Sequence, residues 1–209
     1  MKYTYEEENL KRNLETYEWD DIWWEHAPDK EKPRMLVIGD SISCGYRRLV
    51  TAEMEEKLYV DGLATSKAID NPSFKSLIDY VSSQHENIKI VQFNNGLHGW
   101  HLSDDEYAEF YEKMIDIILA CYNDAKIVIA LTTPVRDKSD LNNLDDRNKR
   151  VLRRNEIALS IAKEKDIPVN DLYSLICDKP HLWTADGVHL KEDGYRIIAK
   201  HTANLVKNI

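Results

Sequence analysis

The stretch Met35-Leu36-Val37-Ile38-Gly39-Asp40-Ser41-Ile42-Ser43 decides how this chain folds. Its first four residues form a continuous apolar run, which is typical of a strand buried on both faces of a parallel sheet. Gly-Asp-Ser then predicts a tight turn, and a helical stretch follows it directly. The segment therefore predicts a strand, a turn and a helix, with Ser41 at the carboxyl end of the strand.

The same alternation continues to the C-terminus. We expect strands at 34–38, 58–63, 88–93, 125–131 and 167–169, and helices at 42–57, 71–83, 103–122, 145–165 and 191–206. Apolar strands joined by right-handed helical crossovers predict the α/β class. The expected fold is a three-layer α/β/α sandwich with a mainly parallel sheet of about five strands. Residues 1–33 are expected to be a leader packing on a single domain of residues 34–209.

Composition excludes several kinds of partner. The 209 residues carry a net charge of −9, which repels nucleic acid and anionic membranes. No segment is long and apolar enough to span a bilayer, and residues 1–10 do not form a secretory signal. Three cysteines fit neither a disulfide framework nor a zinc site. We therefore expect a cytoplasmic protein, with secretion open only through a signal removed beforehand and the oligomeric state undetermined.

A second motif, Asp186-Gly187-Val188-His189, lies just before the last expected helix. A serine hydroxyl becomes a nucleophile when a base takes its proton, and an imidazole oriented by a carboxylate is such a base. Either motif alone also fits a helix cap or a turn. The carboxyl ends of parallel strands share one edge of the sheet, so the fold can bring both motifs together. We expect Ser41, His189 and Asp186 to be catalytic.

These two motifs resemble those of the SGNH (GDSL-like) hydrolases, which carry an N-terminal Gly-Asp-Ser and a C-terminal Asp-x-x-His on this type of sandwich. The resemblance covers residues 34–207. It implies that Ser41 is the nucleophile, His189 the general base and acid, and Asp186 the third member of the triad. It also implies an esterase that forms an acyl-enzyme on Ser41 and needs no cofactor and no metal.

The central motif departs from the family pattern. The family has Gly-x-Asn-Asp after the third strand, where this chain has Asn-Asn-Gly-Leu-His at residues 94–98. The resemblance implies an asparagine N–H that stabilises the oxyanion, from Asn95 or alternatively Asn94. The backbone N–H of Ser41 is a second expected donor. A third is expected near Ser66, with Gly62 as the alternative.

Other side chains near the expected edge are candidates for substrate contact, namely Asp40, His98, Trp100, Thr133 and Trp183. His98 and His101 favour a loop role over a metal site, because no further ligands accompany them. The basic run at residues 149–154 is expected to be a solvated face. Arg136 is expected either to meet an anionic group or to be solvated.

The expected substrate is a small-molecule or carbohydrate ester carrying a short acyl group such as acetyl. A lipase or acyl-thioesterase of the same fold is the alternative, as is a non-catalytic carbohydrate-binding module that retains the fold. The altered central motif favours the binding module, whereas the presence of all three triad residue types favours the enzyme.

Overall fold

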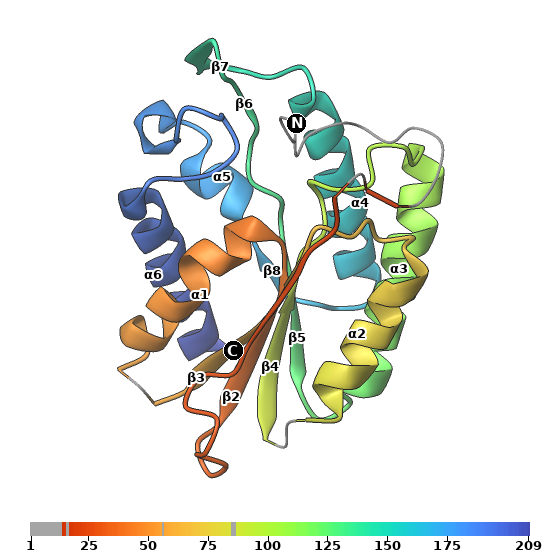
Figure 1. The fold of residues 1–209 in the computed structure, drawn as a ribbon, viewed down its shortest axis with the longest axis vertical. Coiled ribbons are helices and arrows are strands. Elements are labelled where there is room, and N and C mark those ends of the chain that lie inside the picture. Colours follow the sequence, from red (N-terminus) through yellow and green to blue (C-terminus); the bar gives the residue numbers. More distant parts are fainter. Residues whose placement is uncertain (1–13, 16, 56, 85–86) are drawn as a thin grey trace.

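The computed structural model of this chain describes residues 14–15, 17–55, 57–84 and 87–209. A central sheet lies between two layers of helices (Figure 1). One face is covered by α1 (Ser41–Glu53), α5 (Leu172–Ile176) and α6 (Glu192–Asn208), and the other by α2 (Pro72–Ser82), α3 (Asp104–Cys121) and α4 (Asn148–Glu164). The predicted α/β/α sandwich is confirmed.

The sheet has six strands in the order β1-β3-β2-β4-β5-β8. Their bounds are Asp20–Trp23 (β1), Arg34–Gly39 (β2), Tyr59–Thr65 (β3), Ile88–Phe93 (β4), Lys126–Ala130 (β5) and Val169–Asn170 (β8). Strands β3, β2, β4, β5 and β8 pair in parallel, as the sequence predicts. Every residue of β2 is buried, which agrees with its continuous apolar run.

The additional strand, β1, comes from the leader and pairs antiparallel with β3. Trp19 extends this pairing, because its N–H donates to the Ser66 hydroxyl at 2.9 Å and its carbonyl accepts from the Ser66 N–H at 3.2 Å. The sequence did not predict β1, since a strand that begins Asp-Asp at a sheet edge lacks the apolar pattern of a central strand. This part of the leader belongs to the sheet.

Local capping determines where the helices begin. The Asp40 side chain accepts a hydrogen bond from the Ile42 N–H at 2.9 Å, so α1 begins at Ser41, directly after β2. Ser103 and Glu106 form the capping box that the sequence predicts for α3. The nucleophile candidate therefore lies in the first turn of a capped helix at the carboxyl edge of the sheet.

A short hairpin, β6 (Arg136–Asp137) and β7 (Asp140–Leu144), projects beyond this edge (Figure 1). The sequence predicted a loop here, because the hairpin residues are mostly polar and exposed. The sequence also did not predict the 3₁₀ turn at Pro180–Leu182. Within the described part of the chain, no helix is both long enough and apolar enough to cross a membrane.

Candidate active site

Ser41 and His189 meet at the carboxyl edge of the sheet although 148 positions separate them. Ser41 Oγ lies 2.8 Å from Nε2 of His189, and Nδ1 of the same ring lies 2.8 Å from Oδ2 of Asp186. With a proton on Nδ1 donated to Asp186, Nε2 can accept the hydroxyl proton of Ser41. The two sequence motifs thus form one hydrogen-bonded chain that can activate a serine hydroxyl.

The carboxylate of Asp186 is held by its own turn. Its Oδ1 accepts hydrogen bonds from the N–H groups of Val188 (2.8 Å) and His189 (2.9 Å) and from the hydroxyl of Thr184 (2.8 Å). Burial acts to raise the pKa of Asp186, but these hydrogen bonds outweigh it and lower the pKa to about 2. Asp186 is therefore ionised at neutral pH and can stabilise an imidazolium on His189.

The β6–β7 hairpin supports this turn from the other side. Gly187 has φ +73°, and a Cβ on it would lie 2.1 Å from the carbonyl oxygen of Arg136. The Arg136 N–H donates to the Gly187 carbonyl at 2.8 Å. The Arg136 guanidinium is buried, donates to the carbonyls of Leu141 and Cys177, and lies over the ring of Trp183. Neither sequence interpretation of Arg136 is correct, because it is a structural anchor.

Three predicted oxyanion donors are placed elsewhere. The Ser66 N–H donates to the carbonyl of Trp19 at 3.2 Å. Asn95 is fully buried, and its side-chain N–H donates to the carbonyl of Lys67 at 3.0 Å. Gly62 lies inside β3, paired with β1 and β2, three residues before the strand ends. The predictions of Ser66, Asn95 and Gly62 as donors are therefore wrong.

The remaining predicted donors are Ser41 and Asn94. Asn94 follows β4 and is half-buried, but its side-chain amide donates to the carbonyl of Ala130 (2.7 Å) and the hydroxyl of Thr132 (2.9 Å). The Ser41 N–H belongs to the first residue of α1, and the first N–H groups of a helix have no partner within it. Of the predicted donors, the Ser41 N–H best fits an oxyanion role.

The loop after β4 is held from beneath by arginines of α4. Arg154 donates to the carbonyls of Gly96 (3.0 Å), His98 (2.7 Å) and Gly99 (2.6 Å). Arg150 donates to two further carbonyls of the loop. The expectation of a solvated basic face is wrong for these two residues, which instead position the loop beside the site.

His98 and Trp100 are the predicted substrate contacts that keep some exposure. Burial lowers the pKa of His98, the charges of Arg154 and His189 lower it further, and the carboxylates of Asp40 and Glu15 oppose them. His98 is therefore mainly neutral at neutral pH. It lies within electrostatic range of the triad, which suits a side chain at the rim of the site.

His101 has a different partner, since its Nε2 lies 2.8 Å from a carboxylate oxygen of Asp70. Among the residues that the structure describes, no group of three His, Cys, Asp or Glu side chains is arranged to hold a metal ion. His98 and His101 thus contact different carboxylates, those of Glu15 and Asp70.

Three further predicted contacts, Asp40, Thr133 and Trp183, are buried. Trp183 is 0% exposed and forms part of the core on the α1 and α6 side. Asp40 caps α1, and together with Thr133 it lines a small, partly open cavity of about 10 Å³ next to the Ser41 turn. The substrate-contact prediction for Trp183 is wrong, because this side chain is packed in the core, whereas substrate contact by Asp40 and Thr133 stays a prediction.

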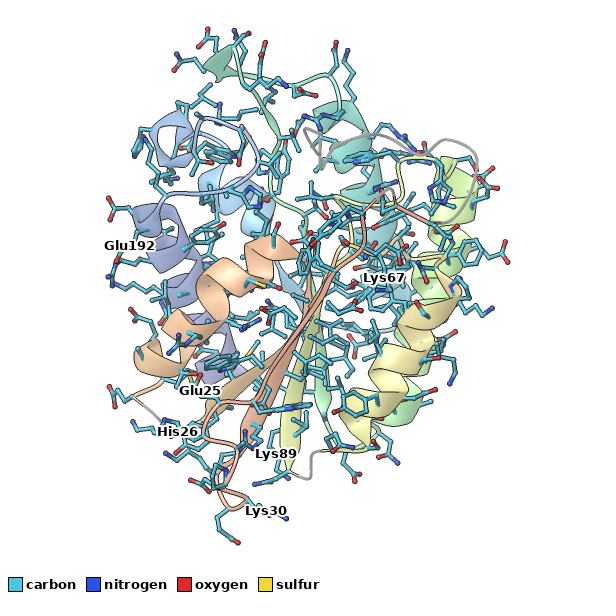
Figure 2. The ribbon with its side chains drawn as sticks, viewed as in Figure 1. Glu25, His26, Lys30, Lys67, Lys89 and Glu192 are labelled. Atoms are coloured by element: carbon cyan, nitrogen blue, oxygen red, sulfur yellow. The ribbon has the colours of Figure 1, made fainter. Side chains whose placement is uncertain are left out.

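A groove of about 650 Å³ runs along the outer side of α1, where Figure 2 labels Glu25, His26 and Glu192. Its wall also includes Leu190, which directly follows His189, and Cys44, which lies one helical turn after Ser41. Burial raises the pKa of the Cys44 thiol, so the thiol stays protonated at neutral pH, which fits a packing role. The groove is of mixed polarity, and Ser41, Asp186 and His189 are not among its lining residues.

Known proteins share this fold. The carbohydrate acetylesterase Est24 from Sinorhizobium meliloti superposes with a TM-score of 0.70 and 14% identity, covering 85% of this chain and 99% of that one. An M. smegmatis aryl esterase superposes with a TM-score of 0.69 and 14% identity, covering 84% of this chain and 99% of that one. The acetyl xylan esterase AlAXEase superposes with a TM-score of 0.63 and 18% identity, covering 83% of this chain and 99% of that one.

Sequence comparison points the same way. The GDSL esterase/lipase WDL1 of Oryza sativa subsp. japonica is 23% identical over 131 residues, which cover 58% of this chain. The match spans 50% of that relative's length. The sequence model of the GDSL-like lipase/acylhydrolase family matches residues 37–197, a stretch that contains Ser41, Asp186 and His189. The chain belongs to the GDSL-like lipase/acylhydrolase family.

Proposed function

We propose that this chain is a serine esterase that hydrolyses carboxylic esters through an acyl-enzyme on Ser41. The observation that carries the proposal is the chain of contacts from Ser41 Oγ through the His189 ring to Asp186, with 2.8 Å at each step. A serine hydroxyl is a weak nucleophile unless a base lies within hydrogen-bond reach. Here the base is in reach and is itself oriented by an ionised carboxylate.

The reaction follows from this geometry. Ser41 Oγ bonds to the ester carbonyl carbon while His189 Nε2 takes the hydroxyl proton, and the Ser41 N–H stabilises the resulting oxyanion. When the tetrahedral intermediate collapses, His189 gives the proton to the departing alcohol. A water molecule then attacks the acyl-enzyme and loses a proton to His189. Return of that proton to Ser41 releases the carboxylic acid and regenerates the enzyme.

A covalent probe tests the nucleophile. A fluorophosphonate is expected to add to Ser41 and raise the intact mass by one adduct, and Ser41→Ala is expected to abolish the adduct. Ser43→Ala is the matched control, because Ser43 is buried and its hydroxyl donates to the Asp40 carbonyl at 2.6 Å. This control should be labelled like the wild type. A folded protein that takes no adduct would instead favour a carbohydrate-binding module that retains the fold.

We further propose that the preferred substrates carry short acyl groups on a carbohydrate or a similar polar alcohol. The groove along α1 includes Leu190, which directly follows His189, and Arg48 and Glu192 bring charged groups to its wall, which suits a hydroxylated substrate better than a long alkyl chain. The similarity of the fold to a carbohydrate acetylesterase and an acetyl xylan esterase agrees with this substrate class.

Acyl length separates this proposal from a lipase or an acyl-thioesterase. The expected result is a kcat/KM for acetyl esters at least about 10-fold above that for esters of ten or more carbons, because a long chain would leave apolar surface in water. The measurement is a series of esters of one chromogenic alcohol, repeated on acetylated sugars. A kcat/KM that rises with chain length would contradict the proposal in favour of a lipase.

A further inference from the structure

The leader is attached to the carboxyl edge of the sheet by several charged contacts. Both carboxylate oxygens of Asp20 accept hydrogen bonds from Nζ of Lys67, at 2.9 and 2.8 Å. Lys67 lies just beyond the end of β3 and is labelled in Figure 2. The Asn71 side chain donates to Glu18 at 2.8 Å. These contacts bring the segment that precedes β1 across the loops on which the site is built.

Glu15 makes a different contact from the rest of the leader. Its Oε1 accepts the backbone N–H of Gly99 at 2.8 Å, and 84 positions separate the two residues in the sequence. The Glu15 side chain is only 16% exposed, so water competes little for this hydrogen bond. The leader thus reaches the loop after β4, the same loop that Arg154 holds from beneath.

Opposite charges hold the two sides of Gly99. Glu15 accepts from its N–H, while the Arg154 guanidinium donates to its carbonyl at 2.6 Å. Hydrogen bonds to ionised groups are roughly twice as strong as neutral ones. Gly99 has φ +71°, a conformation that glycine adopts easily and also leaves easily. The two charged partners therefore restrict a residue that would otherwise be mobile.

The position of Gly99 matters because His98 precedes it. The same Glu15 oxygen lies 4.0 Å from Nδ1 of His98. At its other end the loop continues the pairing of β4 with β2, since the Asn94 N–H donates to the carbonyl of Ile38, three residues before Ser41, at 3.0 Å. A shift at Gly99 would move His98 at the rim of the site.

We propose that Glu15 is a positioning residue, which anchors the Gly99 N–H from the leader and so holds His98 and the loop after β4 in the geometry needed for ester turnover. This inference rests on the proposed esterase function. The leader then affects the site through one carboxylate, that of Glu15, and not merely because the leader is attached to the domain.

Two substitutions at Glu15 separate the acceptor from the charge. Glu15→Ala removes the acceptor of the Gly99 N–H, and we expect kcat to fall about 10- to 100-fold with KM changed less than about 3-fold, because small displacements of a site cost rate more than binding. Glu15→Gln keeps an oxygen at the same place and should retain kcat within about 3-fold. Steady-state kinetics on an acetyl ester measure both.

Asp20→Ala is the matched control, because Asp20 is also a leader carboxylate but accepts from Lys67 and Thr65 rather than from Gly99. Glu18 does not suit this purpose, since it accepts the backbone N–H of Glu15 at 3.2 Å. The kcat of Asp20→Ala should stay within about 3-fold of the wild type. Equal losses in Glu15→Ala and Asp20→Ala would show that only leader attachment matters and would overturn the proposal, as would an unchanged kcat in Glu15→Ala.

Hydrogen exchange of the Gly99 amide keeps this test independent of the catalytic proposal. It should become about 10-fold or more faster in Glu15→Ala and remain slow in Glu15→Gln. Unaltered exchange in Glu15→Ala would overturn the anchor even if Ser41 proves to be the nucleophile. Suppose that the Gly99 amide exchanges faster in Glu15→Ala but the wild-type protein takes no phosphonate adduct. Glu15 would then still anchor Gly99, and only the esterase assignment would have failed.

Discussion

Replacing His189 with glutamine is expected to lower kcat for ester hydrolysis by about 10⁵- to 10⁶-fold. Nε2 of His189 lies 2.8 Å from Ser41 Oγ and must take the hydroxyl proton in one step and return a proton to the leaving alcohol in the next. A glutamine amide can hydrogen-bond to Ser41 but cannot accept its proton at neutral pH. Since substrate binding does not need this transfer, KM should change little, and steady-state kinetics on an acetyl ester check both values.

His181→Gln is the control for this prediction. His181 lies in the 3₁₀ turn upstream of the triad segment, its side chain is exposed, and its backbone carbonyl accepts the hydrogen bond from Lys191. Its kcat should stay within about 2-fold of the wild type. If His189→Gln kept more than about 1% of the wild-type kcat, another group would have to be the base.

The contact between Ser41 and His189 could be predicted because it depends on few, local signals. An apolar strand followed by Gly-Asp-Ser places Ser41 at the carboxyl edge of a parallel sheet, and Asp186 precedes His189 within one turn. Backbone rules for α/β sheets then bring the two motifs together. The structure shows the contact, and the catalytic roles of the three residues remain predictions that the variants above test.

The oxyanion donors were harder, because whether an N–H is free depends on partners far away in the sequence. The Ser66 amide is engaged by Trp19, and the Asn95 side chain by the carbonyl of Lys67. The Trp19 contact could not be identified while the leader was read as a separate polar segment, and the Lys67 contact depends on how the loop after β3 packs against the loop after β4. Ser66 and Asn95 are suitable residue types for oxyanion donors, but in the fold their N–H groups donate to other carbonyls of the protein.

The spacing of the basic residues on α4 distinguishes a buried arginine from an exposed one, which a count of charges does not. Arg154 lies three residues before Ile157 and seven before Ile161, the spacing of one helix face, and all three are buried. Arg153 points elsewhere and is half-exposed. Helical periodicity could therefore have separated an arginine on the apolar face from its solvated neighbour.

Arg154→Met is expected to lower the free energy of unfolding by about 3–5 kcal/mol. Arg154 is 1% exposed and supplies hydrogen bonds to three loop carbonyls, which methionine would leave without a donor. Burial lowers the pKa of Arg154 to about 10, so the guanidinium is still charged at neutral pH, in contact with the ring of Tyr107.

Arg153→Met is the matched control, since it makes the same chemical change one position earlier. The Arg153 side chain is 52% exposed and pairs with Asp104 and Glu156 on the surface, so the variant should lose less than about 1 kcal/mol. Urea unfolding of both variants at neutral pH gives the comparison. Arg154→Lys should fall near Arg154→Met, because a single ammonium cannot reach carbonyls that the planar guanidinium bonds from two nitrogens. Equal stability of the Arg153 and Arg154 variants would mean that the loop beside the triad is held by other contacts.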